Sequence, residues 1–277
     1  MSYQILIAGC GYVGTALGER LVAQGHHVWG LRRDPSALPR SFNKVAADLA
    51  QRSALDALPS TLDYVVYSAS AGEASDAAYQ RAYVQGLGNL LDAIKGRGVR
   101  RVFFTSSTAV YGQRGGEWVD EASETHPSHF SGLRTLEAES LLASSETPAT
   151  VLRCAGIYGP GRTRLLDAVR QGTASMSTRF TNRIHRDDIA GLTAFLIERD
   201  LGPRVLLLCD DEPASQRDVT TFLATRLGAP LPDPATAEPP LRGGDKRCRN
   251  AGLKATGYAL LYPTYREGYD AMLQPAP

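Results

Sequence analysis

A glycine-rich turn close to the N-terminus constrains the fold more than any other feature of the chain. The run "YQILIAG" is short and apolar, as expected of a buried parallel strand. Gly9, Gly11 and Gly14 follow with GxGxxG spacing, and residues 12–24 then carry an apolar face at helical spacing. A strand, a glycine turn and a helix in this order predict the start of a βαβ unit.

Such a turn is suited to binding a dinucleotide. Its glycines allow a tight turn and a close approach of the backbone to a pyrophosphate, which sits at the positive end of the helix. Tyr12 and Val13, which open the helix, belong to the same candidate site. The alternative interpretation is that the three glycines serve packing alone.

The rest of the chain alternates between strand-like and helix-like runs. This alternation predicts an α/β fold with a Rossmann-type doubly wound parallel sheet and a small C-terminal α/β lobe on the substrate side. We expect a dinucleotide-binding domain over 1–154 and the smaller lobe over 155–277, with some strands of the lobe returning to the main sheet. The Pro- and Gly-rich segment 229–244 is predicted to be a surface loop. Further strands are predicted within 27–31, 43–49, 63–70, 100–107, 149–159 and 203–211, and two of the helices within 76–97 and 131–145.

Composition narrows the class of protein. The net charge of +1 over 277 residues argues against nucleic acid or an anionic membrane surface as a partner. No apolar run approaches membrane-spanning length, and the N-terminus lacks the basic region of a signal peptide. Four scattered cysteines without a CxxC pair indicate reduced thiols rather than a metal site. We therefore expect a cytoplasmic protein without a metal.

The end of the second predicted strand indicates which dinucleotide is bound. Arg32 and Arg33 stand there, and arginine binds a 2′-phosphate bidentately, which favours NADP(H) over NAD(H). Asp34 lies at the usual offset of a ribose-binding acid, but it precedes Pro35 and is expected to begin a turn. Two solvated arginines are the alternative.

Several longer motifs then occur in a recognisable order. They are "FFTSSTAVYG", "VLRCAGIYGPGR", "RIHRDDIA", "CDDEPASQRDV" and "YPTYREGYDAML". Together with the glycine turn, they resemble the extended short-chain dehydrogenase/reductases, the NAD(P)-dependent epimerase/dehydratase relatives that act on nucleotide sugars. The resemblance covers nearly the whole chain. It implies a small-molecule substrate, with a nucleotide sugar as one candidate, and a homodimer formed through the helices at 76–97 and 131–145.

The resemblance also assigns roles to individual residues. Asp48, Ala69 and Ser70 would flank the adenosine half of the cofactor, and Ser107 matches the family's catalytic Ser/Thr. On the substrate side the matching residues are Tyr111, Tyr158, Arg162 and His185. For His185 a structural role is an equal alternative.

Two departures from the family pattern put the chemistry in doubt. The family uses a Tyr as general base and a Lys four residues later, on the same helical face, to lower its pKa. Phe130 stands at the Tyr position and Arg134 at the Lys position. Phe130 has no ionisable proton, and Arg134 stays cationic but could still contact the cofactor ribose. A chain with the GxGxxG turn but without the catalytic Tyr and Lys resembles an atypical branch of the family.

Two interpretations therefore remain open. The first is an NADP(H)-dependent oxidoreductase or isomerase with a substituted base, for which the nearby candidates are Tyr111, Glu121, His126 and His129. Each of these four has a structural or surface role as its alternative. The second interpretation is a non-catalytic sensor or regulatory protein that binds NADP(H). The retained "YGPGR" and "RIHRDD" segments favour the enzyme slightly.

Overall fold

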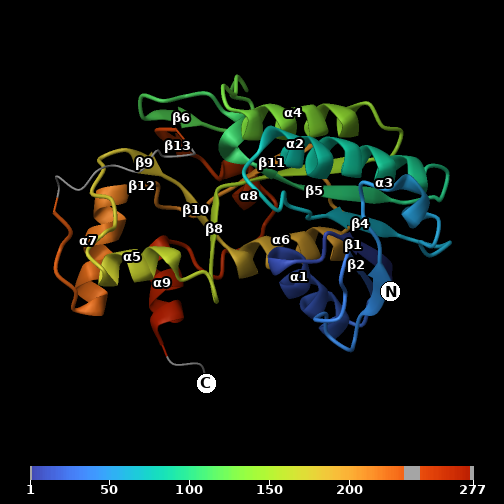
Figure 1. Ribbon diagram of the computed structural model, residues 1–277, viewed down its shortest axis with the longest axis horizontal. Helices are drawn as coiled ribbons and strands as arrows, with labels where there is room; N and C mark the ends of the chain where they lie inside the picture. Colours follow the sequence, from blue (N-terminus) through green and yellow to red (C-terminus); the bar gives the residue numbers. More distant parts are fainter. Residues whose placement is uncertain (1, 234–243, 275–277) are drawn as a thin grey trace. The chain divides into compact units, whose positions relative to one another are not determined.

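The computed structural model describes residues 2–233 and 244–274, and Figure 1 shows the course of the chain. Most of the predicted loop at 229–244 therefore lies outside the described residues. The chain divides into two compact units, and each contains segments that are distant in sequence. The first unit comprises Met1–Val110, Pro127–Arg153 and Ile189–Leu206, and the second comprises Tyr111–His126, Cys154–Asp188 and Leu207–Pro277.

A seven-stranded sheet confirms the predicted fold class. Its strand order is β11-β7-β5-β4-β1-β2-β3, and β1 pairs in parallel with both β2 and β4. Ala8 at the end of β1 lies opposite Leu31 on β2 and Tyr67 on β4, so the carboxyl ends of three strands meet at one edge. The strands are β1 (Gln4–Ala8), β2 (His27–Arg32), β3 (Asn43–Ala46), β4 (Tyr64–Tyr67), β5 (Arg101–Ser107), β7 (Ala149–Cys154) and β11 (Val205–Leu208).

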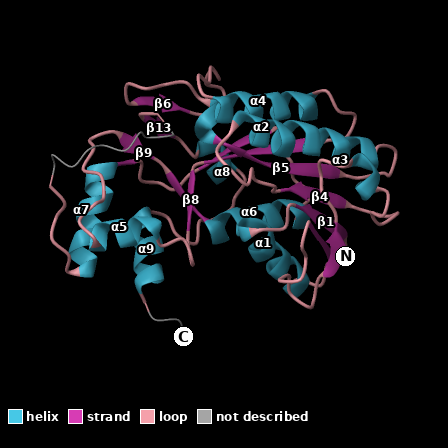
Figure 2. Ribbon diagram, in the orientation of Figure 1, coloured by secondary structure: helices cyan, strands magenta, loops and turns pink. Residues whose placement is uncertain are grey.

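Helices cover both faces of this sheet. Figures 1 and 2 show α2, α3 and α4 on one face and α1 and α6 on the other. The predicted helix at 76–97 is a continuous stretch of helical turns with a π-helical segment at its centre. The elements are α1 (Tyr12–Ala23), α2 (Asp76–Tyr79), the π-helix η2 (Gln80–Gln85), α3 (Gly86–Ile94), α4 (Phe130–Ala143), α6 (Arg186–Glu198), and the short 3-10 turns η1 (Arg52–Leu55) and η3 (Thr108–Val110).

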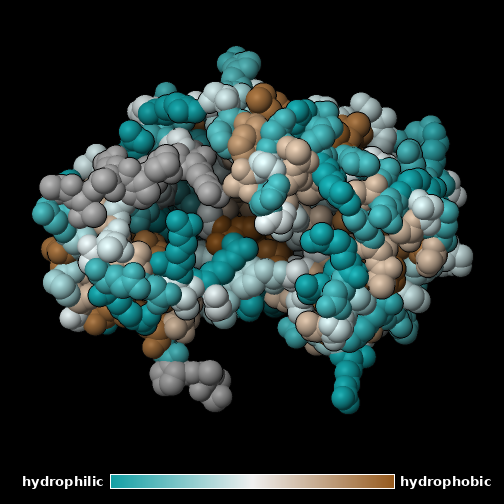
Figure 3. All heavy atoms as spheres, in the orientation of Figure 1, coloured by the Kyte–Doolittle hydropathy of each residue, from teal (hydrophilic) through white to brown (hydrophobic). Residues whose placement is uncertain are grey.

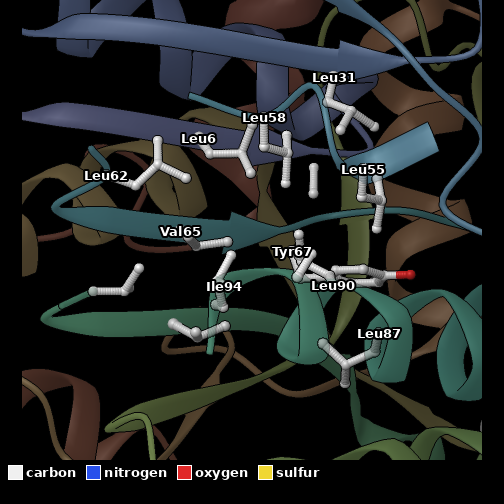
Figure 4. Close-up of a cluster of buried hydrophobic side chains, with 14 of the residues drawn as sticks. Leu6, Leu31, Leu55, Leu58, Leu62, Val65, Tyr67, Leu87, Leu90 and Ile94 are labelled. Atoms are coloured by element: carbon white, nitrogen blue, oxygen red, sulfur yellow. The ribbon is translucent and has the colours of Figure 1, made fainter. Parts of the chain in front are cut away.

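Between the sheet and the helices α3 and α4 lies a large apolar core. Figure 4 shows Leu6, Val65 and Tyr67 of the strands packed with Leu87 and Leu90 of α3. All four residues of β4 are buried, which explains why this strand reads as an uninterrupted apolar run. Each fully buried leucine contributes roughly 1.5–3 kcal/mol to folding. The core thereby fixes the strand ends that form the candidate site.

The second unit contains short strand pairs and its own helical core. The strands pair as β6 with β13, β8 with β10, and β9 with β12. A smaller apolar cluster, including Leu223 and Tyr265, holds α5, α7 and α9 together. The elements are β6 (Glu117–Val119), β8 (Gly156–Tyr158), α5 (Arg164–Arg170), β9 (Phe180–Thr181), β10 (Arg183–His185), β12 (Ala214–Ser215), α7 (Gln216–Leu227), β13 (Lys246–Cys248), α8 (Ala251–Ala255) and α9 (Tyr265–Leu273).

None of the helices in the part of the chain that the structure describes combines the length and the apolar character needed to cross a bilayer. Figure 3 shows mainly hydrophilic side chains over the first unit, with hydrophobic residues in separate patches over α4. Leu133 on α4 is half exposed.

Candidate active site

The glycine turn between β1 and α1 requires glycine at its first position. Gly9 has φ +78°, a backbone conformation that side chains with a Cβ rarely adopt. A Cβ on Gly9 would lie 2.3 Å from the Cα of Ala69, which follows β4. The amides of Gly9 and Cys10 both donate to the carbonyl of Leu31, at 3.0 and 2.9 Å, and so fix the turn to the end of β2.

The N-terminus of α1 is open to an anion. Gly11 is the N-cap residue, and among the described residues no side chain caps the helix there. A Cβ on Gly11 would find no atom closer than the carbonyl oxygen of Gly9 at 3.8 Å, whereas one on Gly14 would lie 2.8 Å from Ile7. Gly14 thus lets α1 pack on β1, and Gly11 leaves space above the first helical amides. These residues fit the pyrophosphate of a dinucleotide.

Arg32 and Arg33 lie at the end of β2, beside this turn. Arg32 is half-buried and Arg33 is exposed, and within residues 2–233 and 244–274 neither guanidinium forms an ion pair. Asp34 accepts a hydrogen bond from the Ser36 amide at 2.9 Å, which is the turn expected before Pro35. The two arginines therefore remain available to an anionic group.

Asp48 is held by two partners. Its Oδ1 accepts from the Ala50 amide at 3.0 Å, and its Oδ2 accepts from Arg81 Nη2 at 2.6 Å. The Ala50 amide, and then Arg81, lower the pKa of the Asp48 carboxyl, and the nearby charge of Arg33 acts in the same direction. Arg81 was not a candidate on sequence grounds, because it is 33 residues away from its partner. Ser70, exposed after β4, completes the predicted adenosine-side residues.

Phe130 and Arg134, the residues predicted at the Tyr and Lys positions, both contact α2. The ring of Phe130 meets that of Tyr79 edge-on, with centroids 5.3 Å apart. Arg134 donates to both carboxylate oxygens of Asp76, at 2.8 and 2.9 Å, and to Glu137 at 2.9 Å. Arg134 lowers the pKa of the Asp76 carboxyl. The guanidinium thus already has carboxylate partners in the protein.

Ser107 ends β5, at the same edge of the sheet as the glycine turn. Its Oγ accepts a hydrogen bond from the Ala109 amide at 3.1 Å. The hydroxyl hydrogen can therefore be donated to a ligand. Ser107 is half-buried, as expected of a residue that borders a site.

The four predicted substrate-side residues fall into two groups. Tyr158 and His185 lie together, nearly fully buried, with ring centroids 5.1 Å apart. Tyr111 is also buried and donates its hydroxyl to the Asp120 carbonyl at 2.8 Å. Arg162 donates to the Ile157 carbonyl at 2.9 Å. The latter two thus bond to backbone carbonyls near them in sequence.

A buried polar cluster surrounds Tyr158 and His185 in the second unit. Among the described residues the Tyr158 hydroxyl, His185 Nε2 and Asp210 Oδ2 have no hydrogen-bond partner. Burial raises the pKa of Asp210 to about 8, although Arg183 opposes the shift, and lowers the pKa of His185 to about 4. Asp210 was missed by the sequence analysis, since only burial distinguishes it from neighbouring acids.

The remaining titratable groups of the described residues do not form a metal site. Within the described residues no three His, Cys, Asp or Glu side chains gather as metal ligands. Cys10, Cys154, Cys209 and Cys248 are free thiols and all four are buried.

The family model of the NAD dependent epimerase/dehydratase family matches residues 5–202. The chain belongs to this family. The match covers the glycine turn, Ser107 and α4, and it agrees with the resemblance inferred from the motifs.

Individual relatives extend over nearly the whole chain. A 3-diazoavenalumate denitrifying reductase from a Streptomyces species is 28% identical over 96% of this chain and 98% of its own length. A solved structure from Methylobacillus flagellatus, described as an NAD-dependent epimerase/dehydratase, is 41% identical, with a TM-score of 0.85 over 98% of this chain and 97% of that one. The structure of MoeE5 with UDP-glucose and NAD is 26% identical, with a TM-score of 0.81 over 97% of each chain.

Proposed function

We propose that this protein is an oxidoreductase or isomerase that uses a nicotinamide dinucleotide. The observation that carries the proposal is the open N-terminus of α1 at Gly11, next to the close approach of Gly9 and Ala69. Backbone amides there can hold a pyrophosphate at the positive end of the helix. Family membership and the NAD bound by MoeE5 support the same class of cofactor.

We favour NADP(H) over NAD(H) because of the side chains at the end of β2. Arg32 and Arg33 have no carboxylate partner among the described residues, and Asp34 is engaged in its own turn. A 2′-phosphate would give both guanidinium groups an anionic partner. Asp48, held by Arg81, would remain at the adenosine side as a fixed acceptor.

For the substrate we propose a nucleotide sugar. MoeE5 is bound to UDP-glucose, and the Streptomyces relative is a reductase, so a nucleotide-sugar ligand and a reduction reaction both occur among similar proteins. Ser107 would hydrogen-bond the reacting oxygen. The cytoplasm is the proposed location, because the four cysteines are free and not joined in disulfides, which is usual for cytoplasmic proteins.

A non-catalytic NADP(H)-binding protein is the second candidate. Arg134, which is bound to Asp76 and Glu137, favours it, because a cationic group so engaged is a poor substitute for the family's Lys. We further propose a two-fold dimer through α3 and α4. Light scattering tests it, and a strictly monomeric mass at micromolar concentration would rule it out.

The decisive experiment is a calorimetric titration of the protein with NADPH and NADH in parallel. We expect tighter binding of NADPH, and we expect Arg33→Gln to weaken NADPH binding about tenfold, equivalent to about 1.4 kcal/mol, while NADH binding changes little. Arg40→Gln, another exposed arginine nearby, is the matched control. Binding of neither nucleotide to folded protein would end the proposal.

If a dinucleotide binds, turnover separates the two candidates. Candidate substrates are tested as a panel of UDP-glucose, dTDP-sugars and 3-oxo acids. At a constant protein concentration, the absorbance of NAD(P)H reports oxidation or reduction, and product analysis reports isomerisation. Binding without turnover across this panel would favour the sensor.

A further inference from the structure

The face of α4 that is turned toward β5 is defined by its buried residues. Gly132, Thr135, Ala138, Glu139 and Leu142 are buried on this helix. The Glu139 carboxylate accepts from Ser106 Oγ on β5 at 2.5 Å and from Arg153 Nη2 on β7 at 2.7 Å. This network fixes the rotation of the helix about its own axis.

The first turn of α4 makes an equally close approach. A Cβ on Gly132 would lie 2.3 Å from the Ala109 carbonyl oxygen, in the segment that directly follows Ser107. The helix therefore contacts the segment just after β5 at its first turn and bonds near the carboxyl ends of β5 and β7 at its third. This face of α4 therefore adjoins the end of β5, where Ser107 lies.

Ser131 and Thr135 occupy this face, whereas Phe130 and Arg134 do not. Thr135, four residues before Glu139, is fully buried, and Ser131 lies one turn earlier still. Thr135 Oγ1 donates to the Ser131 carbonyl at 2.7 Å. Each position along a helix rotates the side chain by about 100°, so Phe130 and Arg134 point elsewhere. Their contacts with Tyr79 and Asp76 of α2 agree with this direction.

Ser131 carries a base of its own. Its Oγ lies 2.9 Å from His129 Nδ1, and the same nitrogen accepts the Ser131 backbone N–H at 3.3 Å. In the neutral ring Nδ1 therefore bears the lone pair and Nε2 the hydrogen. The Ser131 hydroxyl can then donate to the imidazole, which is the orientation that activates a hydroxyl group.

We propose that Ser131 and His129 are the proton-handling pair of this protein, in place of the family's Tyr and Lys. The proposal rests on the nicotinamide-dependent reaction proposed above. The residues equivalent to the family's Tyr and Lys are then Ser131 and Thr135, each one residue later than Phe130 and Arg134. Thr135 then stands where the family has its Lys, and because it carries no charge it cannot stabilise an alkoxide on Ser131, so the base must be the imidazole.

Ser131, His129 and the nicotinamide account for every proton and hydride in the oxidation of an alcohol. When a secondary alcohol is oxidised, its carbon would lose a hydride to the oxidised nicotinamide that the proposed function supplies, and its hydroxyl proton would pass to Ser131 Oγ. The proton of Ser131 passes at the same time to His129 Nδ1, which leaves a carbonyl and an imidazolium. Reduction reverses both transfers. Ser107 would donate a hydrogen bond to the reacting oxygen throughout.

The position of Ser131 can be tested without turnover. Because the four native cysteines are buried, a cysteine introduced at the surface is the site at which iodoacetamide reacts fastest. NADP⁺ at ten times its Kd should slow alkylation of Ser131→Cys about tenfold, since only unliganded protein reacts. Leu133→Cys, half exposed on the opposite face of α4, should be unaffected. Protection of Phe130→Cys but not Ser131→Cys would overturn the assignment.

The chemical roles require kinetics on the substrate that the panel identifies. Ser131→Ala and His129→Asn should each lower kcat by about 10²–10⁴, since Asn keeps an acceptor for the Ser131 amide but cannot take a proton. Ser131→Thr should recover most of the rate, and Ser140→Ala, at an exposed position later on α4, should match the unchanged protein. An unchanged kcat in Ser131→Ala would overturn the inference.

The failures are distinguishable. Loss of all dinucleotide binding by the unchanged protein refutes the proposed function and this inference with it. Normal binding with no protection at residue 131 refutes this inference alone.

Discussion

The glycine turn and the buried cluster of Tyr158, His185 and Asp210 differ in the groups that they offer to a ligand. The turn offers backbone amides, contains no acidic or basic side chain and depends on φ +78° at Gly9. The cluster offers titratable side chains, but Tyr158, His185 and Asp210 are nearly fully buried. A ligand at the turn would be held by backbone geometry alone, whereas the charge state of the cluster is set by burial and changes with pH.

The strongest test of this contrast is Gly9→Val. A β-branched side chain would be forced into a left-handed conformation and against Ala69. We expect a loss of about 3–5 kcal/mol in the free energy of unfolding and no detectable dinucleotide binding. Urea denaturation and calorimetry measure the two effects.

Gly11→Ala serves as the matched control, because a Cβ there has no atom closer than 3.8 Å. Its stability should stay near that of the unchanged protein, while binding weakens. Equal destabilisation by both substitutions would contradict the distinct roles assigned to the two glycines.

Asp210→Asn tests the other side of the comparison. Because the pKa of Asp210 rises to about 8, the folded chain keeps a proton between about pH 4 and 8 that the unfolded chain has released. Folding stability contributed by this group therefore falls as pH rises across that window. The substitution should raise stability at pH 8.5 by about 2–4 kcal/mol and change it little at pH 4. Thermal unfolding at the two pH values measures the difference, and a uniform shift would contradict it.

The smallest effect is expected for Tyr158→Phe. Its hydroxyl has no hydrogen-bond partner among the described residues, so its removal should change stability by less than about 1 kcal/mol. A loss of 2 kcal/mol or more in urea denaturation would mean that the hydroxyl is bonded after all.

The sequence predicts those structural elements whose requirements lie in consecutive residues. The buried run of β4 and the glycines after β1 carry their structural requirement in the sequence itself, and the seven strands of the main sheet follow from such runs. The pair β6–β13 was missed, since three-residue strands have no measurable periodicity. The contacts Arg81–Asp48 and Arg134–Asp76 were missed because each joins residues at least 33 positions apart.

The bond network of Ser106, Glu139 and Arg153 has a consequence for descent. It secures α4 at the third turn of the helix, away from positions 129–131. Residues at positions 129–131 could therefore be exchanged during divergence without loss of the fold. A protein lineage could in this way lose its ancestral general base and keep the fold. A different general base could then evolve on the same helix.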